Sequence, residues 1–212
     1  MDVANPTQSI IPSGHGAVLG VLARTEVPLS GRRIAELTRP HFSQRRVHDV
    51  LQQLTRSGIV MKETRPPSNL YRLNQDHVAA EAIVALTRLW ATLMARIRTE
   101  LDTWSVPPQA AWLFGSAARG EGTEDSDIDI LFVLPAGLDD PATAVVWERQ
   151  IETLREKIIA WSGNACETIE VDNSELAAAV ERDDRLVRDL REHAVVLAGR
   201  HPRAFLRRTA AR

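Results

Sequence analysis

Residues 115–130 read GSAARGEGTEDSDIDI and form the most informative stretch of the C-terminal half of the chain. A short apolar segment, AAWLF at 110–114, precedes the run. The last four residues of the run begin a second largely apolar segment, DIDILFVL at 127–134. This order predicts a strand, a turn, a short helix, a loop and a second strand. Because side chains alternate along a strand, Asp127 and Asp129 would share one face, with Cα atoms ~6.6 Å apart, twice the strand rise.

The two ends of the run carry complementary chemistry. Two carboxylates held this close repel each other unless a cation lies between them, and oxygen ligands favour Mg²⁺ or Mn²⁺. At the other end, Gly115 lets the backbone approach a phosphate, whose oxygens the following N–H groups and the Ser116 hydroxyl can bind. Arg119, one turn later, can add positive charge or brace the loop. The run therefore predicts a phosphate site beside a metal site, which suits in-line attack by a hydroxyl on a nucleotide phosphorus.

The sequence also carries a family resemblance. Residues 115–120, GSAARG, followed by residues 126–129, SDID, resemble the GSxxRG…SDxD signature of the polymerase-β-like nucleotidyltransferase superfamily, and most of all its minimal bacterial group. The resemblance covers about residues 108–199. It implies that Mg²⁺ or Mn²⁺, held by the catalytic Asp127 and Asp129, helps to transfer NMP from an NTP, expected to be ATP, to a hydroxyl of a protein, a tRNA or a small molecule. The residues that it implies for nucleotide binding are Gly115, Ser116, Arg119 and Ser126.

A third carboxylate on a neighbouring strand is also implied by the resemblance, as a metal ligand that helps to deprotonate the acceptor. We assign this catalytic role to Glu170 in the predicted strand CETIEV at 166–171. In the register that we predict, Ile169 and Val171 face the core and Glu170 faces the aspartates. Glu167 faces the other side in that register and is the second choice. Members of the superfamily more often carry Asp at this point.

The N-terminal part predicts three short helices followed by a β-hairpin. Residues 44–74 closely resemble the recognition helix and wing of bacterial transcription regulators, so a winged helix-turn-helix domain is expected at 14–75. This resemblance implies DNA contact through a set of polar residues on the helix and the wing: Ser43, Gln44, Arg45, Arg46, His48, Arg65 and Arg72. A winged helix that binds an acceptor RNA or a protein, or that forms dimers, is the alternative.

Charge and composition narrow the class of protein. The chain has 212 residues and a net charge of −2, yet Arg24 to Arg72 contains ten Arg and Lys against four Asp and Glu. Such a basic segment indicates either a nucleic-acid module or a solvated surface. The single cysteine excludes an intrachain disulfide scaffold, and no apolar run reaches the ~20 residues that span a bilayer. Without signal-peptide features at the N-terminus, a cytoplasmic protein is expected.

Apolar residues recur at steps of three and four over residues 77–104 and predict one long connecting helix. Its stripe could pack on the chain's own domains or on a second copy, as in a homodimer. The fold class predicted for the whole chain is α+β, with a winged helix at 14–75, a linker helix at 76–105, a nucleotidyltransferase α/β domain with a small mixed sheet at 106–199 and a basic tail at 200–212.

Two functions remain open from the sequence. The first is an enzyme tied to nucleic acid or to control of its own expression, since small members of the superfamily occur in toxin–antitoxin pairs. The alternative is a DNA-binding transcription regulator whose nucleotidyltransferase domain only senses nucleotide.

Overall fold

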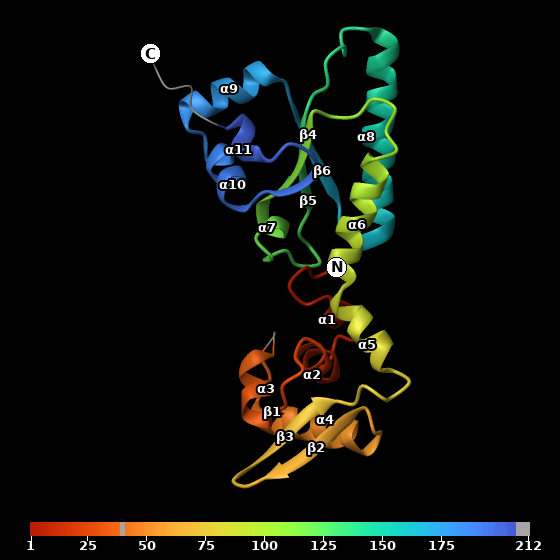
Figure 1. Cartoon of the computed structure of the whole chain (residues 1–212), viewed down its shortest axis with the longest axis vertical. Helices are drawn as coiled ribbons and strands as arrows, with labels where there is room; N and C mark the ends of the chain where they lie inside the picture. The colour runs from red at the N-terminus through yellow and green to blue at the C-terminus, as the bar shows by residue number, and fades with distance from the viewer. Residues whose placement is uncertain (39–40, 207–212) are drawn as a thin grey trace. The chain divides into compact units, whose positions relative to one another are not determined.

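The computed structural model describes residues 1–38 and 41–206 and divides into two compact units (Figure 1). The N-terminal unit holds Asp2 and Ala4–Trp90, and the C-terminal unit holds Met1, Val3 and Ala91–Arg212. Among the described residues, no helix is both long enough and apolar enough to cross a membrane.

The N-terminal unit has the helix–strand–helix–helix–hairpin order of a winged helix-turn-helix. Its helices are α1 (Pro6–Ile10), α2 (Gly14–Leu22), α3 (Gly31–Leu37), α4 (Gln44–Arg56), α5 (Ala80–Thr87) and the start of α6 (Leu89–Leu101). Its strands are β1 (Leu29–Ser30), β2 (Val60–Arg65) and β3 (Ser68–Leu73). They form an antiparallel sheet in the order β1-β3-β2, in which β2 and β3 make the hairpin (Figure 1). The fold predicted for this part is therefore confirmed.

Local sequence explains why α3 and α4 begin where they do. Ser30 precedes α3 and accepts a hydrogen bond from Arg33 N–H at 3.2 Å, and Ser43 precedes α4 and accepts one from Arg46 N–H at 3.3 Å. These are N-cap bonds, which stabilise a helix by about 1 kcal/mol each. The apolar residues of α4 all lie in the core of the unit: Val47, Val50, Leu51 and Leu54.

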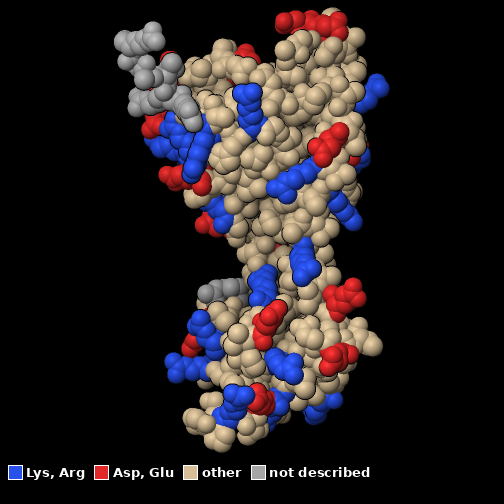
Figure 2. Space-filling view, in the orientation of Figure 1, with Lys and Arg blue, Asp and Glu red and all other residues tan. Residues whose placement is uncertain are grey.

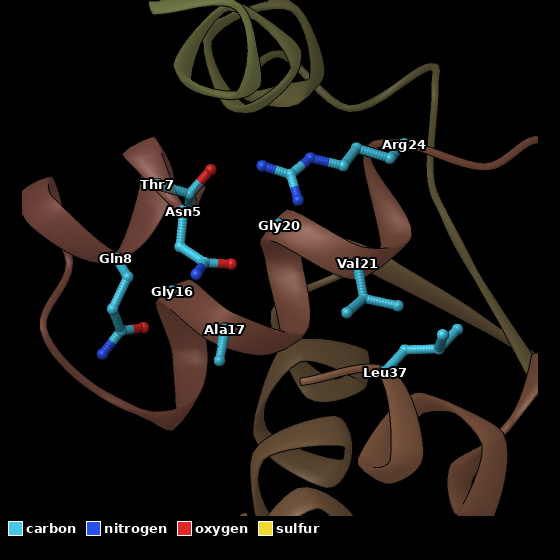
Figure 3. A pocket seen from close by; sticks show the side chains of 9 residues that line it. All are labelled: Asn5, Thr7, Gln8, Gly16, Ala17, Gly20, Val21, Arg24 and Leu37. Atoms are coloured by element: carbon cyan, nitrogen blue, oxygen red, sulfur yellow. The ribbon is translucent and has the colours of Figure 1, made fainter. Parts of the chain in front are cut away.

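Residues 1–13 contain the short helix α1, which packs on α2. Gly16 leaves room for this contact, because a Cβ atom there would collide with the carbonyl oxygen of Ile11, the residue that follows α1. The two helices border a cavity of about 20 Å³ (Figure 3). Two of its buried oxygens, Thr7 Oγ1 and Gln8 Oε1, have no hydrogen-bond partner in the part of the chain that the structure describes. A space of this size and polarity fits one water molecule.

The predicted single helix over 77–104 is wrong in one respect. The structure has two helices, α5 and α6, interrupted at Arg88, where φ is −102° and ψ is 4°. The later part of the apolar stripe is buried, at Leu93, Ile97, Leu101 and Trp104. Trp104 stacks on Phe132 of the C-terminal unit, so this part of the stripe is used within the chain's own domain.

The C-terminal unit is built on a small mixed sheet, as predicted. Its strands are β4 (Ala110–Phe114), β5 (Ile128–Val133), β6 (Cys166–Val171) and β7 (Val195–Gly199). Its further helices are α7 (Gly115–Ala118), α8 (Pro141–Ser162), α9 (Asn173–Arg182), α10 (Arg185–His193) and α11 (Pro202–Phe205). The strand order is β6-β5-β4-β7, with β5 and β6 parallel and the other pairs antiparallel.

The two faces of this sheet have different coverings (Figure 1). Helices α6 and α8 lie on one face, and α9, α10 and α11 lie on the other. On the first face, which we call the aromatic face, the rings of Trp104, Phe132 and Trp147 lie with centroids 5.4–5.8 Å apart. On the second face, Trp112 and Leu131 pack among apolar residues of α9 and α10.

The segment predicted as a basic tail is ordered at its start. Residues 202–205 form α11, and the ring of Phe205 lies 5.4 Å from that of Trp112. Leu206 is buried, and its carbonyl accepts a hydrogen bond from Arg191 at 2.9 Å. Residues 207–212 of the predicted tail lie outside the described residues.

Candidate active site

Strand β4, the turn after it and strand β5 bring the predicted site residues together. Gly115 opens α7 with φ at +71°, a conformation that favours glycine. A Cβ atom at Gly115 would collide with the carboxylate of Asp129, so the turn and the aspartate are in close approach. Ser116 follows Gly115 and is half-buried, whereas Asp127, just before β5, is exposed. The missing side chain at Gly115 is thus what permits the turn to lie against Asp129.

Asp129 lies in a cluster of negative charge. Burial, followed by the charges of Asp127, Glu167 and Asp189, raises the pKa of Asp129 above its usual value, and Arg119 partly offsets this rise. Among the described residues, no group of three or more His, Cys, Asp or Glu side chains is already arranged to hold a metal ion. The donors are nevertheless hard carboxylate oxygens that repel one another. This chemistry fits Mg²⁺ or Mn²⁺, whose remaining ligands are usually water and substrate phosphate.

The register that we predicted for Glu170 is wrong. In the parallel pairing of β5 and β6, Asp129 lies beside Glu167, and Phe132 lies beside Glu170. Glu170 therefore belongs to the aromatic face, where its Oε2 accepts a hydrogen bond from Trp147 Nε1 at 2.6 Å. The physical reason is that CETIEV carries two Glu residues three positions apart, so that one points to each face of the sheet. Alternation alone therefore does not decide which of them faces the aspartates.

Glu167, the second choice from the sequence, lies on the aspartate face of the sheet instead. Its side chain is 62% exposed, and its only ion-pair partner among the described residues is Arg155 Nη2 at 3.7 Å. Such a long, exposed contact holds a carboxylate weakly, so Glu167 is available to a ligand. The residue that can complete the aspartate pair is thus Glu167, and Glu170 is not placed to do so.

Arg119 is engaged by two carboxylates. Its Nε donates to Glu121 Oε2 at 2.9 Å, and its Nη1 donates to Asp189 Oδ1 at 2.8 Å. These two bonds, the one to Glu121 contributing most, raise the pKa of Arg119. The second oxygen of Asp189 accepts the backbone N–H of Gly115 at 3.1 Å. Of the two roles that the sequence left open for Arg119, the contacts in the structure correspond to bracing the loop.

Asn164 and Ser126 shape the loop that leads into Asp127. Asn164 is 3% exposed, and its Nδ2 lies 2.9–3.2 Å from three carbonyl oxygens, those of Thr123, Glu124 and Ser126. The Ser126 hydroxyl accepts the Thr123 N–H at 2.9 Å. This contact assigns the hydroxyl a structural task, while nucleotide binding by Ser126 stays a prediction. Sequence reasoning missed Asn164 and Asp189, since neither belongs to a recognisable motif.

Cys166 was expected to lie in the core. It is 5% exposed at the start of β6, and burial raises the pKa of its thiol to about 12. The thiol is therefore protonated at neutral pH and is not poised as a nucleophile.

The predicted nucleic-acid residues lie on the surface of the N-terminal unit. Five are exposed at or near the N-terminal end of α4: Ser43, Gln44, Arg45, Arg46 and His48. On the wing, Arg65 is exposed and pairs with Glu63 at 2.7 Å, and Arg72 is exposed on β3. Figure 2 shows Lys and Arg spread over this unit on the face drawn, interspersed with Asp and Glu. The distribution on that face is mixed, so individual residues rather than a general basic surface have to carry an interaction.

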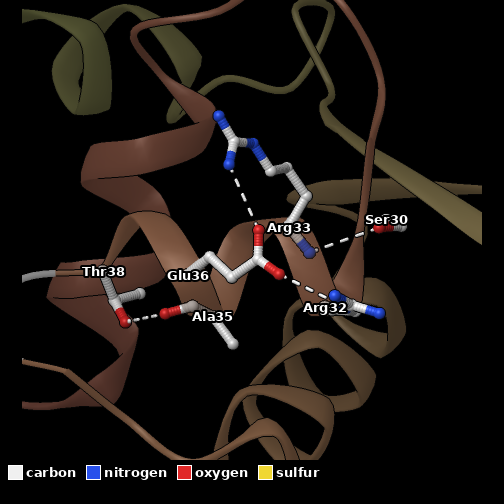
Figure 4. Close-up of polar contacts among 6 residues, drawn as sticks. All are labelled: Ser30, Arg32, Arg33, Ala35, Glu36 and Thr38. Atoms are coloured by element: carbon white, nitrogen blue, oxygen red, sulfur yellow. Dashed lines mark hydrogen bonds and ion pairs between the residues drawn. The ribbon is translucent and has the colours of Figure 1, made fainter.

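Two pairs of neighbouring arginines in this unit differ in their partners. Arg32 and Arg33 on α3 both bind Glu36, at 3.0 and 3.1 Å (Figure 4). For Arg45 and Arg46 on α4, no ion pair is found within residues 1–38 and 41–206. The charge of the α3 pair is thus partly neutralised inside the protein, and that of the α4 pair is not.

Comparison with known proteins gives one family. The model of the nucleotidyltransferase domain family matches residues 94–197. No curated protein matches the chain. Among solved structures, a structure of TrmBL2, an archaeal chromatin protein whose title reports a novel mode of DNA binding, is 17% identical, covers 79% of this chain and 71% of its own, and has a TM-score of 0.27. That likeness is too low to carry an argument. The matched residues lie within the C-terminal unit, so it is this unit that is similar to the nucleotidyltransferase domain family.

Proposed function

We propose that the C-terminal unit is an Mg²⁺-dependent enzyme that transfers NMP from an NTP, expected to be ATP, to a hydroxyl acceptor. The carrying observation is that Asp129 lies beside Glu167 in the pairing of β5 with β6, with Asp127 just before β5 and the Gly115–Ser116 turn against Asp129, in the part of the chain that the nucleotidyltransferase domain model matches. The acceptor is a protein side chain, a tRNA end or a small molecule, and a toxin–antitoxin setting fits the first two.

Each residue has a task in this proposal. Asp127 and Asp129 hold the metal ion, and Glu167 serves as the third carboxylate that receives the acceptor's proton. The ion would neutralise charge on the triphosphate. The acceptor oxygen then forms a bond to the α-phosphorus, while the bond from that phosphorus to pyrophosphate breaks and pyrophosphate leaves. The Ser116 hydroxyl and the backbone of the turn hold phosphate oxygens, for which Gly115 provides the close approach.

Transfer of label tests this proposal. The protein is incubated with α-³²P-labelled NTPs, Mg²⁺ and cell extract, and label is followed in protein, RNA and small molecules. We expect transfer by the wild type and a loss of about 10³-fold or more in the double variant Asp127→Ala, Asp129→Ala. Asp125→Ala is the matched control, because Asp125 is an exposed acid of the same loop and is not part of the carboxylate cluster. Equal transfer by the wild type and the double variant, or none by either, contradicts the proposal.

A second function, DNA binding by the N-terminal unit, is favoured by the two arginines of α4, which form no ion pair with any residue that the structure describes. We propose that Arg45 and Arg46 contact duplex DNA from the start of the recognition helix, with support from Arg65 and Arg72 on the wing. In a gel shift, Arg45→Ala plus Arg46→Ala should weaken binding at least 10-fold and flatten its salt dependence.

The charge-matched control for DNA binding is Arg32→Ala plus Arg33→Ala, which removes two arginines whose charge Glu36 partly neutralises. Equal losses from both double variants would show that only net charge matters. Tighter binding of tRNA than of duplex DNA would favour the acceptor-binding role instead. DNA binding that responds to NTP without any label transfer would favour the regulator over the enzyme.

A further inference from the structure

Asp189 of α10 reaches the turn that is proposed to hold the triphosphate. It lies 74 residues after Gly115, and its two oxygens have different partners in the turn: Oδ2 takes the Gly115 N–H at 3.1 Å and Oδ1 takes Arg119 Nη1 at 2.8 Å. The Asp189 side chain is 21% exposed, so these bonds form where little water competes for the carboxylate. A hydrogen bond to a charged group is stronger in such a place than in open solvent. One carboxylate thus ties the first residue of α7 to the residue that ends it.

The position of Asp189 has an electrostatic cost. Its charge is among those that raise the pKa of Asp129, so it adds repulsion to a site that is already negative. Arg119 offsets that charge but is itself shared with Glu121, at 2.9 Å. The two carboxylates balance the charge of the guanidinium and hold its Nε and Nη1 in place, although three of its five N–H donors take no part in these two bonds. These contacts favour a brace over a phosphate ligand as the role of Arg119.

We propose that Asp189 is a positioning residue that holds the Gly115–Ser116 turn in the shape that receives the triphosphate. It acts through the Gly115 amide and through Arg119, and it keeps the turn against Asp129. This inference rests on the proposed nucleotidyl transfer and specifies how its phosphate site is built. The competing arrangement is that Asp189 occupies the place of a phosphate oxygen, which NTP would displace to reach Arg119.

The two arrangements predict opposite changes in the KM for NTP when Asp189 is replaced in the full chain. If Asp189 positions the turn, Asp189→Ala raises KM for NTP about 10-fold or more and lowers kcat less, because the substrate is held in a loosened site. Asp189→Asn, which keeps an acceptor for the Gly115 N–H, recovers part of the loss. Arg119→Ala has a smaller effect than Asp189→Ala, because the bond between Asp189 and the Gly115 amide remains, and the double variant is no worse than Asp189→Ala alone. A lower KM in Asp189→Ala, or an unchanged one, overturns the inference.

Asp183→Asn is the matched control for Asp189→Asn. Asp183 also pairs with two arginines, Arg188 at 3.1 Å and Arg191 at 3.2 Å, but it does not contact the turn. Its φ of 52° is one that Asn tolerates well. This variant should therefore keep the wild-type KM and kcat.

Hydrogen exchange at the Gly115 amide tests the positioning role by a measurement that does not depend on enzyme activity. We expect exchange at least 10-fold faster in Asp189→Ala than in the wild type, and unchanged exchange in Asp183→Asn, because only the first variant removes the acceptor. Unchanged protection of Gly115 in Asp189→Ala overturns the inference. A wild type that transfers no label while Gly115 loses protection in Asp189→Ala would instead contradict the proposed function alone.

Discussion

Glu167 and Glu170 lie on the same strand, β6, but on opposite faces of the sheet. Glu167 lies beside Asp129 and adds to the negative charge around it. Glu170 lies beside Phe132 and accepts a hydrogen bond from the indole of Trp147. The comparison teaches that the position of a glutamate in this strand decides its surroundings: one lies beside Asp129, and the other lies beside aromatic rings on the opposite face. The following predictions test this difference between the two faces.

The largest expected effect comes from exchanging the two carboxylates for amides. Glu167→Gln should lower kcat for nucleotidyl transfer about 10²- to 10³-fold, because it removes a proposed metal ligand and proton acceptor. Glu170→Gln should keep kcat within about 3-fold, because an amide oxygen can still accept the bond from Trp147. Initial rates at saturating NTP and Mg²⁺ check both values. A larger loss in Glu170→Gln than in Glu167→Gln would contradict the role that we propose for Glu167.

On the aspartate side, the loop before Asp127 depends on the buried amide of Asn164. Asn164→Asp removes both N–H donors and places a carboxylate among three carbonyl oxygens. The Met1 ammonium, which donates to Asn164 Oδ1, offsets part of this cost, so we expect a loss of about 2 kcal/mol in the free energy of unfolding. Urea denaturation measures it. Asn173→Asp is the control, because Asn173 is exposed and makes one bond of 3.3 Å, to Gln109. If both variants are equally stable, Asn164 does not hold the loop.

On the aromatic face, Trp147→Phe tests the indole that binds Glu170. The change removes that hydrogen bond and part of the packing against Trp104 and Phe132. Glu170 is exposed and can turn to water, so the cost should be about 2 kcal/mol, mostly from packing. Chemical denaturation gives the stability, and kcat should stay near the wild-type value. A loss of activity without a loss of stability would link this face to catalysis.

The smallest effect is expected from Asp129→Asn in the metal-free protein. Since the pKa of Asp129 is raised in the folded state, the wild type loses stability as pH rises from about 4 through that pKa. The variant lacks this penalty, so at pH 7 its Tm should be about 1–3 °C higher, a small shift because solvent screens a partly exposed group. Near pH 3 the two should melt together. A variant that melts lower than the wild type at pH 7 would contradict the charge repulsion.

Much of the fold followed from local sequence. The apolar stripe of α4, the serine caps of α3 and α4, the hairpin and the strands around the 115–130 run could all be predicted, because each depends on neighbours a few residues away. The break at Arg88 was not predicted, since the apolar stripe continues through it. The register of β6 was not predicted correctly either, since one of its two Glu residues points to each face of the sheet and either could face the aspartates.

By itself, the sequence determined the pairing of Asp127 with Asp129, the glycine that lets the turn approach them and the winged helix ahead of the domain. Only the tertiary structure decided that Glu167 and not Glu170 faces the aspartates, that Asp189 binds the turn from 74 residues away and that Asn164 holds the loop. The physical reason is the range of the interactions. Periodicity and capping act within one or two helical turns, whereas strand register and contacts between distant segments exist only once the sheet and its covering helices have closed.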